Sequence, residues 1–264
     1  MNLISLSDLS PTDIRNIWRL VGEPVEPLNG TVAWSFEGNG FRTRTTFIQA
    51  FRDLGLEFTE LPNLLKTGER ARDLAGYLDA FYDLYVVRES DHARLVEFAA
   101  ASRRPVINAM SSDGHPCEVF TDAYYVDTAV TPLERASVCL WGPPTNVFRS
   151  WHELARVLGF TVAHVCEARF HESKPNVLFS EVLPGAVDVV ITDAWPQGLD
   201  AKAWSLSKQH LAEMGNPSLL PTPPFKVGGE LDFDPVDYAG FCGYAQKELL
   251  VPVQKAIVRY VFGV

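Results

Sequence analysis

Residues 31–54 read TVAWSFEGNGFRTRTTFIQAFRDL, and this stretch decides the fold class. Residues 31–35 form a short β-prone run, a glycine-containing corner follows at 38–40, and apolar residues recur at helical spacing over 47–54. The stretch therefore predicts a strand, a loop and a helix in that order. Such a unit is the building block of α/β domains with parallel sheets.

The same alternation continues along the chain. An apolar run at 84–87 is followed by a helical pattern at 91–101, a β-prone run at 105–109 and a helical pattern from about residue 116. Residues 10–13 carry the capping serine, proline and acid of an opening helix. Strands that alternate with helices predict a mostly parallel sheet covered on both faces.

A break at Thr131–Pro132 precedes a second round of this pattern, so we expect an α/β protein with two doubly wound parallel-sheet domains. Its β-prone runs are 137–141, 160–165 and 187–192, and its helical pattern covers 146–158. Residues 235–264 are largely helical by pattern, and Pro252 must kink or interrupt them. We expect the last helix to pack back on the first domain. The expected boundaries are 1–131, 132–240 and 241–264.

The composition restricts the class of partner. The 264 residues include 33 acidic and 23 basic side chains, for a net charge of -10. This balance disfavours nucleic acid and membrane surfaces, so we expect small-molecule partners. The four cysteines form no CxxC pair, which favours reduced thiols and a cytoplasmic location. No signal-peptide pattern or membrane-spanning apolar run occurs, so we expect neither export nor insertion.

Residues that follow strands are the first candidates for a site, because ligands of open parallel sheets bind at the carboxyl ends of strands. Arg42, Thr43 and Arg44 lie where the helix after the first strand begins. Guanidinium groups and the N–H groups of a helix N-terminus suit a phosphate or a carboxylate. A solvated helix N-terminus with hydroxyl caps is the structural alternative.

Arg88 and His115 come after the next two strands. Taken separately, Arg88 is typical of a surface ion pair and His115–Pro116 of a turn. The three segments nevertheless occur in an order that a parallel sheet brings together. We therefore expect Arg42, Arg88 and His115 to converge on one crevice.

Six segments carry a resemblance to a known family. They are LISLSDLSPTDI (3–14), FEGNGFRTRTTF (36–47), VVR (86–88), PVINAMSSDGHPCEVFTD (105–122), WGPPTNVFRS (141–150) and VITDAW (190–195). In this order they resemble the aspartate and ornithine carbamoyltransferases, over nearly the whole chain. The resemblance, closer to the ornithine type, implies a carbamoyl-phosphate domain, an amino-acid domain, a returning helix and a homotrimer with active sites between subunits.

The resemblance also assigns roles on the phosphate side. The family's Ser-Thr-Arg-Thr-Arg loop corresponds to Gly40, Phe41, Arg42, Thr43 and Arg44, so the charged part is retained and two hydroxyls are lost. Each lost hydroxyl hydrogen bond costs about 0.5–1.5 kcal/mol.

Arg88 corresponds to the family's second phosphate-side arginine, and His115 to the histidine that polarises the carbamoyl carbonyl. The family's His-Pro-x-Gln motif here places Glu118 where an amide is usual. At ~5 Å and an effective dielectric of ~20, this carboxylate repels an anion by about 3 kcal/mol, roughly a hundredfold in affinity. The alternative is a structural ion pair between Glu118 and Arg42, Arg44 or Arg88.

On the acceptor side the resemblance assigns Asn146 to the amino-acid head group and Asp193 to the substrate amines. A helix cap and a strand-end turn are the structural alternatives. The family's His-Cys-Leu-Pro corresponds to 218–221, which keeps Leu220 as a binding candidate and lacks the cysteine. Lys66 corresponds to a mobile basic loop that acts across the subunit boundary, or to a solvated loop.

The resulting hypothesis is a carbamoyltransferase-like enzyme that transfers a carbamoyl group from carbamoyl phosphate or a related donor to an amine of a small amino-acid-like acceptor, in specialised metabolism. One alternative is a non-catalytic paralogue that binds an anion or a partner subunit, and another is the same fold acting on an amidino or other cationic donor. We expect no cofactor and no metal. The nearest metal-like group, at 164–171, is equally well explained by a half-buried strand with scattered polar residues.

Overall fold

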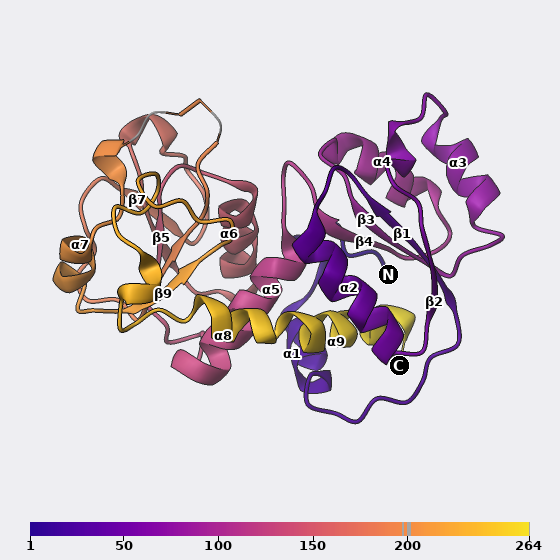
Figure 1. The fold of residues 1–264 in the computed structure, drawn as a ribbon, viewed down its shortest axis with the longest axis horizontal. Helices are drawn as coiled ribbons and strands as arrows, with labels where there is room; N and C mark the ends of the chain where they lie inside the picture. The colour runs from indigo at the N-terminus through magenta and orange to yellow at the C-terminus, as the bar shows by residue number, and fades with distance from the viewer. Residues whose placement is uncertain (197, 200–201, 264) are drawn as a thin grey trace. The chain divides into compact units, whose positions relative to one another are not determined.

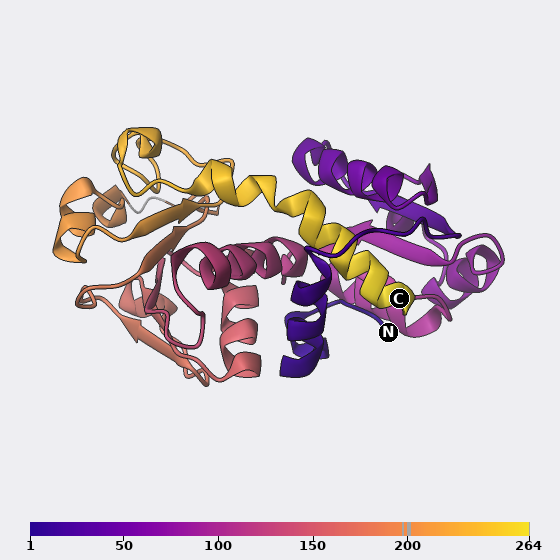
Figure 2. The same cartoon turned by 90° about the horizontal axis from the view of Figure 1, so that it is seen from below.

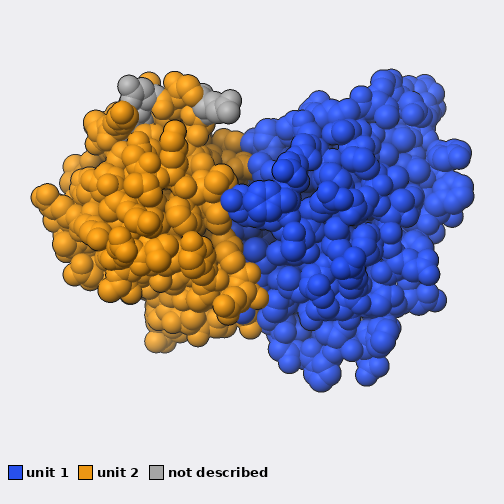
Figure 3. Space-filling view, viewed as in Figure 1, with its two compact units in different colours: residues 1–120, 249–264 blue, residues 121–248 orange. Residues whose placement is uncertain are grey.

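The structure is a computed structural model that describes residues 1–196, 198–199 and 202–263. It divides into two compact units (Figure 3). Unit 1 contains residues 1–120 and 249–264, and unit 2 contains residues 121–248. None of the described helices is both long and apolar enough to span a membrane.

Unit 1 is built on a parallel sheet with the strand order β2-β1-β3-β4. Its strands are β1 (Thr31–Phe36), β2 (Glu57–Glu60), β3 (Leu84–Arg88) and β4 (Val106–Met110). Its helices are η1 (Leu6–Asp8), α1 (Pro11–Leu20), α2 (Phe41–Asp53), η2 (Leu64–Lys66), α3 (Ala71–Leu78), α4 (His92–Ala101) and α9 (Leu250–Phe262), and α5 (Pro116–Tyr125) begins in it.

Helices cover both faces of this sheet, as expected (Figures 1 and 2). On one face, apolar residues of α3 and α4 such as Leu74 and Phe98 pack against Tyr85 of β3. On the other, Trp34 of β1 packs against Phe47 of α2 with ring centroids 5.4 Å apart, and α9 packs against α1 and α2. Each face of the sheet is therefore buried.

The register aligns the carboxyl ends of three strands. Phe36 of β1 is paired with Arg88 of β3, and Arg88 with Met110 of β4. Because β1 and β3 are neighbours without being consecutive, the loops after them run in opposite directions. That is the topological switch point at which open α/β sheets bind ligands.

Unit 2 repeats the architecture with the strand order β7-β6-β5-β8-β9, again parallel. Its strands are β5 (Val138–Trp141), β6 (Val162–Val165), β7 (Val177–Ser180), β8 (Val189–Thr192) and β9 (Ser218–Pro221). Its helices are the π-helical η3 (Val126–Val130), α6 (Asn146–Leu158), η4 (Ala168–Phe170), η5 (Lys202–Trp204), α7 (Lys208–Glu213), η6 (Pro235–Asp237) and α8 (Gly243–Glu248). The expected class of two parallel-sheet α/β domains is confirmed.

The units divide inside α5, after Phe120, and not at the expected break at Thr131–Pro132. A continuous helix crosses the division, so no turn signal marks it in the sequence. The expected second boundary at residue 240 also differs, because α8 packs against β9 and belongs to unit 2.

The interruption expected from Pro252 lies just before it, at Leu249, between α8 and α9. Pro252 itself is in the first turn of α9, where a missing N–H costs no helical hydrogen bond. The expected return of the last helix to the first domain is confirmed. Lys255 of α9 pairs with Asp53 of α2 at 3.1 Å, and the Tyr260 hydroxyl donates to Asp13 of α1.

Candidate functional site

The first turn of α2 and the end of β3 meet at the carboxyl edge of the unit 1 sheet. Gly40 precedes α2 with a left-handed φ of 32°, and a Cβ there would lie 3.1 Å from Cδ and Nε of Arg88. The Arg88 side chain therefore packs directly on the Gly40 backbone. Its Nη1 donates to the Thr43 hydroxyl at 3.0 Å.

Burial lowers the pKa of Arg88, and the nearby Glu37 carboxylate opposes this effect. The guanidinium nevertheless remains charged, because the ordinary pKa of arginine is far above neutrality. In the described part of the chain, Thr43 is its hydrogen-bond partner, so further N–H groups of Arg88 are available to a ligand. Among the described residues no side-chain hydrogen bond caps the N-terminus of α2, which adds backbone N–H groups and the positive end of the helix dipole.

The other two arginines of the segment have different surroundings. Arg42 is exposed, and its guanidinium lies 4.5 Å from the ring centroid of Phe41. Arg44 lies over the ring of Phe36 at 4.6 Å and forms an ion pair with Glu60, with Nε 3.3 Å from Oε1. Arg44 is therefore held by a carboxylate of unit 1, whereas Arg42 extends from the first turn of α2.

Lys66 is the last residue of η2 and lies among carboxylates. Its ammonium is 2.5 Å from Glu89, 3.2 Å from Glu37 and 3.3 Å from the Ser90 hydroxyl. Glu37 follows β1, and Glu89 and Ser90 follow β3, so three loops meet at this lysine. Neither sequence-based interpretation of Lys66 anticipated this intrachain cluster.

His115 immediately precedes α5, and its carbonyl accepts the first helical hydrogen bond, from the Val119 amide at 3.1 Å. The loop before it is tied to the loop after β3, because the Ser112 amide donates to the Ser90 carbonyl at 3.2 Å. His115 and Glu118 are both half-buried and three residues apart, which places them on one face of α5.

The structure thus brings Gly40, Thr43 and Arg88 into contact. It places Arg42 in the first turn of α2, after β1, and His115 in the loop after β4, at the same edge of the sheet. Glu37, Glu89 and Ser90 are residues that sequence reasoning missed. The signal was available, since all three directly follow the predicted strands that also supplied the arginines.

In unit 2, the candidate residues also lie at the carboxyl ends of strands. Asn146 is the first residue of α6, but the cap of that helix is Thr145, whose hydroxyl accepts from the Phe148 amide at 3.3 Å. Asp193 follows β8, and its carboxylate accepts from the Ala194 amide at 2.8 Å. Leu220 is buried within β9 with 3% exposure.

His164, in the segment that was weighed as a metal site, forms a buried pair with His152 of α6. His164 Nε2 lies 2.8 Å from the Gly142 carbonyl, and His164 Nδ1 lies 3.0 Å from His152 Nε2. Burial lowers the pKa of His152 to about 3 and that of His164 to about 4, so both rings are neutral at pH 7. The described residues contain no group of three or more His, Cys, Asp or Glu side chains that could hold a metal ion.

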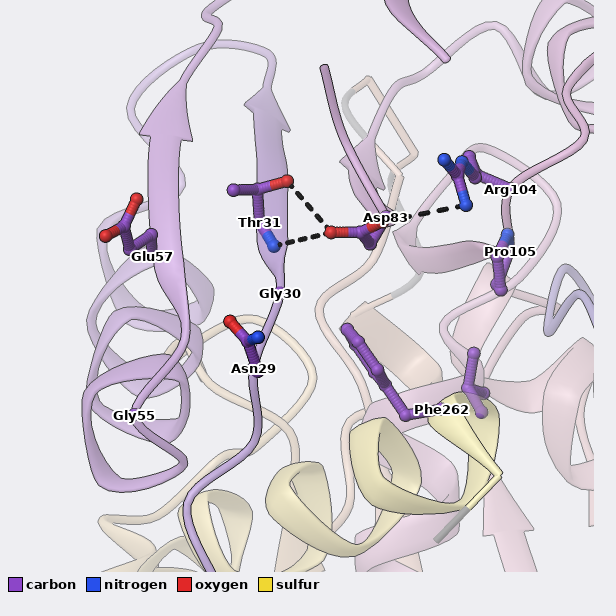
Figure 4. Close-up of a pocket in the computed structure, with 10 residues that line it drawn as sticks. Asn29, Gly30, Thr31, Gly55, Glu57, Asp83, Arg104, Pro105 and Phe262 are labelled. Carbon is purple, nitrogen blue, oxygen red and sulfur yellow. Dashed lines mark hydrogen bonds and ion pairs between the residues drawn. The ribbon is translucent and has the colours of Figure 1, made fainter. Parts of the chain in front are cut away.

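A cavity of about 690 Å³ lies at the opposite, amino edge of the unit 1 sheet (Figure 4). Three of its polar residues are connected through Asp83, which accepts from the amide and the hydroxyl of Thr31 at 3.0 and 3.1 Å and lies 3.6 Å from Arg104. Phe262 of α9 packs against Gly30, where a Cβ would lie 2.9 Å from the ring. These contacts hold the strand starts and α9 together.

Comparisons with known proteins agree with this picture. Residues 1–128 match the family described as "Aspartate/ornithine carbamoyltransferase, carbamoyl-P binding domain". The ornithine carbamoyltransferase of Methanopyrus kandleri is 28% identical over 312 aligned positions, covering 99% of this chain and 97% of its own. That of Caulobacter vibrioides is 26% identical, covering 86% and 82%. The chain belongs to the aspartate/ornithine carbamoyltransferase family.

Solved structures of the family share the fold. The anabolic ornithine carbamoyltransferase of Campylobacter jejuni superposes with a TM-score of 0.88 at 25% identity, covering 100% of this chain and 99% of that one. The ornithine carbamoyltransferase of Pyrococcus furiosus gives 0.89 at 23% identity, covering 99% and 97%.

Proposed function

We propose that this protein is a carbamoyltransferase that transfers the carbamoyl group of carbamoyl phosphate to an amine of a small amino-acid-like acceptor. The observation that carries the proposal is the Arg88 guanidinium, packed on Gly40 and bonded to Thr43 beside the uncapped N-terminus of α2. A partly buried guanidinium at a helix N-terminus is suited to a phosphate group.

In the proposed reaction the acceptor nitrogen attacks the carbonyl carbon, the bond from that carbon to the phosphate oxygen breaks, and the amine loses a proton to the departing phosphate. Arg88, Arg42 and Thr43 neutralise the departing phosphate together with N–H groups of α2. His115 donates a hydrogen bond to the carbonyl oxygen as negative charge develops on it. Fixed donors of this kind, with the positioning of the two substrates, supply most of the catalysis in acyl transfer.

For the acceptor we propose Asn146 and Asp193 as binding groups, on the strength of the family resemblance. A carboxylate at position 193 favours an amine-bearing acceptor. Gly40, Phe41 and Glu118 replace the two hydroxyls and the amide of the family pattern, which points to a specialised donor or acceptor. A cytoplasmic homotrimer is part of the same proposal, and light scattering coupled to size-exclusion chromatography tests the trimer.

The test is calorimetric titration of the whole chain with carbamoyl phosphate and with inorganic phosphate, followed by a mass-spectrometric screen of amines, ornithine included. We expect both anions to bind and at least one amine to gain a carbamoyl group. Binding without turnover of any amine supports the non-catalytic paralogue. The absence of binding and of turnover refutes the proposal.

A further inference from the structure

Lys66 connects three loops at the carboxyl edge of the unit 1 sheet. Together with Glu37 and Glu89 it forms what we call the Lys66 cluster. The loop that carries Lys66 also pairs with the end of β1, because the Leu61 and Asn63 amides donate to the carbonyls of Trp34 and Phe36 at 2.8 and 3.0 Å. The ammonium is therefore a tether at the far end of a loop already attached to the sheet.

Glu89 needs this tether. Its side chain is only 2% exposed, and it accepts from the Asp91 amide at 2.9 Å and pairs with Lys66 at 2.5 Å. A buried carboxylate without a compensating cation strongly destabilises the folded state. In the described part of the chain, Lys66 is the cation within ion-pair distance of Glu89.

Glu37 adds a second negative charge on the side of Arg88. Hydrogen bonds from Ser90 lower the pKa of Glu37 to about 2, so it is ionised at neutral pH, and the pairing with Glu89 raises the pKa of Lys66. The charges of Arg88 and Lys66 balance those of Glu37 and Glu89. Removing Lys66 leaves one net negative charge beside the guanidinium that faces the anion.

We propose that Lys66 is a positioning residue that acts on the bound anion through Glu37 and Glu89: it neutralises these carboxylates and fixes loop 61–70, and it does not itself touch the phosphate. The inference rests on the proposed function for the identity of the anion. If Lys66 bound the phosphate directly, its loss would weaken binding whatever the state of Glu89. In the proposal, the loss weakens binding only because Glu37 and Glu89 are no longer neutralised.

A double-mutant cycle separates the two possibilities, with inorganic phosphate as the calorimetric probe. Lys66→Met is expected to weaken phosphate binding about tenfold. Adding Glu89→Gln restores the charge balance, so the double variant is expected to bind within about threefold of the wild type. A double variant as weak as Lys66→Met overturns the proposal, because it means that Lys66 contacts the anion directly.

Two controls accompany the cycle. Lys66→Arg keeps the charge and is expected to retain the affinity within about threefold. Lys255→Met removes a lysine of the same unit that pairs with Asp53 on α2, and it is expected to leave phosphate binding unchanged. A loss with Lys255→Met equal to that with Lys66→Met shows a nonspecific charge effect and contradicts the proposal.

Hydrogen exchange of the ligand-free protein tests the tether independently of the activity. We expect the amides of Leu61 and Asn63 to exchange at least about tenfold faster in Lys66→Met, with the amides of β3 unchanged. Unchanged exchange of the loop overturns the tether even where phosphate binds. Faster exchange in a protein that binds no phosphate refutes the proposed function and leaves the tether established.

Discussion

The two ends of the unit 1 sheet both carry charged side chains, but they are arranged differently. At the amino edge, Thr31 and Arg104 both bind Asp83, in the lining of a sizeable cavity that also includes Phe262 (Figure 4). At the carboxyl edge, Arg88 is partly buried with one hydroxyl as its hydrogen-bond partner among the described residues. The volume of the cavity alone would therefore place a binding site at the amino edge, whereas the available hydrogen-bond donors of Arg88 place it at the carboxyl edge.

Parallel topology explains the difference. At the amino edge, polar groups that precede neighbouring strands bind each other, as Asp83 does with Thr31 and Arg104. At the carboxyl edge, the register aligns Phe36, Arg88 and Met110, so the loops after three strands gather their polar residues at one place. An anion site forms where these loops supply hydrogen-bond donors that are not all used in hydrogen bonds within the protein.

Replacing one arginine at each edge of the sheet is expected to give the largest difference in phosphate affinity. Arg88→Met is expected to weaken phosphate binding at least about a hundredfold, because it removes a desolvated charge-assisted donor. Arg104→Met, at the amino edge, is expected to leave the affinity unchanged. Calorimetry on both variants measures the difference. Equal losses in the two variants would show that the edges are not functionally distinct.

Glu118→Gln is expected to strengthen phosphate binding by up to about a hundredfold, since it removes a negative charge from the half-buried face that also carries His115. The comparison of dissociation constants at two salt concentrations shows whether the gain is electrostatic. An unchanged affinity would mean that a structural ion pair already neutralises this carboxylate.

Gly40→Ser restores the residue of the family pattern, yet it is expected to weaken phosphate binding by about fivefold. The position has a left-handed φ of 32°, and the new Cβ would lie 3.1 Å from Arg88. Strain and displacement of the guanidinium outweigh one added hydroxyl. Tighter binding by this variant would contradict the role assigned to the contact between Gly40 and Arg88.

A substitution of Asp79, in the turn before β3, is expected to have the smallest effect on phosphate binding. Burial raises its pKa, but hydrogen bonds from the Arg103 amide, Ser102 and Tyr85 together lower it by more, so the net pKa is below the ordinary 3.8. The unfolded chain therefore binds the proton first as the pH falls, and the stabilisation by Asp79 is present above pH 3.8 and lost below it.

The corresponding variant is Asp79→Asn. It is expected to lower the free energy of unfolding by about 2 kcal/mol at neutral pH, to flatten its acid dependence, and to leave phosphate binding unchanged. Denaturant unfolding between neutral and acid pH measures the first two effects. An altered phosphate affinity would show that the turn before β3 is coupled to the anion site.

The sequence predicted the central strands and missed three at the edges. The strands β1, β3, β5 and β8 are buried on both faces and read as apolar runs, so their periodicity is clear. The missed strands β2, β7 and β9 all lie at the edge of a sheet. The sequence of β2 is EFTE, in which exposed and half-buried residues alternate, and this is a weak signal in a four-residue strand.

The candidate site was predictable as far as it depends on position after a strand. Arg88 and Thr43 were proposed on that basis, and the structure brings them within hydrogen-bond distance. The positions of Glu37 and Glu89 after strands could be seen in the sequence, but their ion pairs with Lys66 could not be predicted, because these contacts depend on where separate loops meet. The loss of a serine at Gly40 was interpreted as a lost hydroxyl, whereas the structure shows space that the Arg88 side chain occupies.

The most direct test of the account is a crystal structure of the whole chain grown with inorganic phosphate. We predict density for the anion within hydrogen-bond distance of the Arg88 guanidinium and the first N–H groups of α2. Phosphate bound instead beside Arg104 in the amino-edge cavity, or Arg88 turned away from an anion held elsewhere, would contradict it.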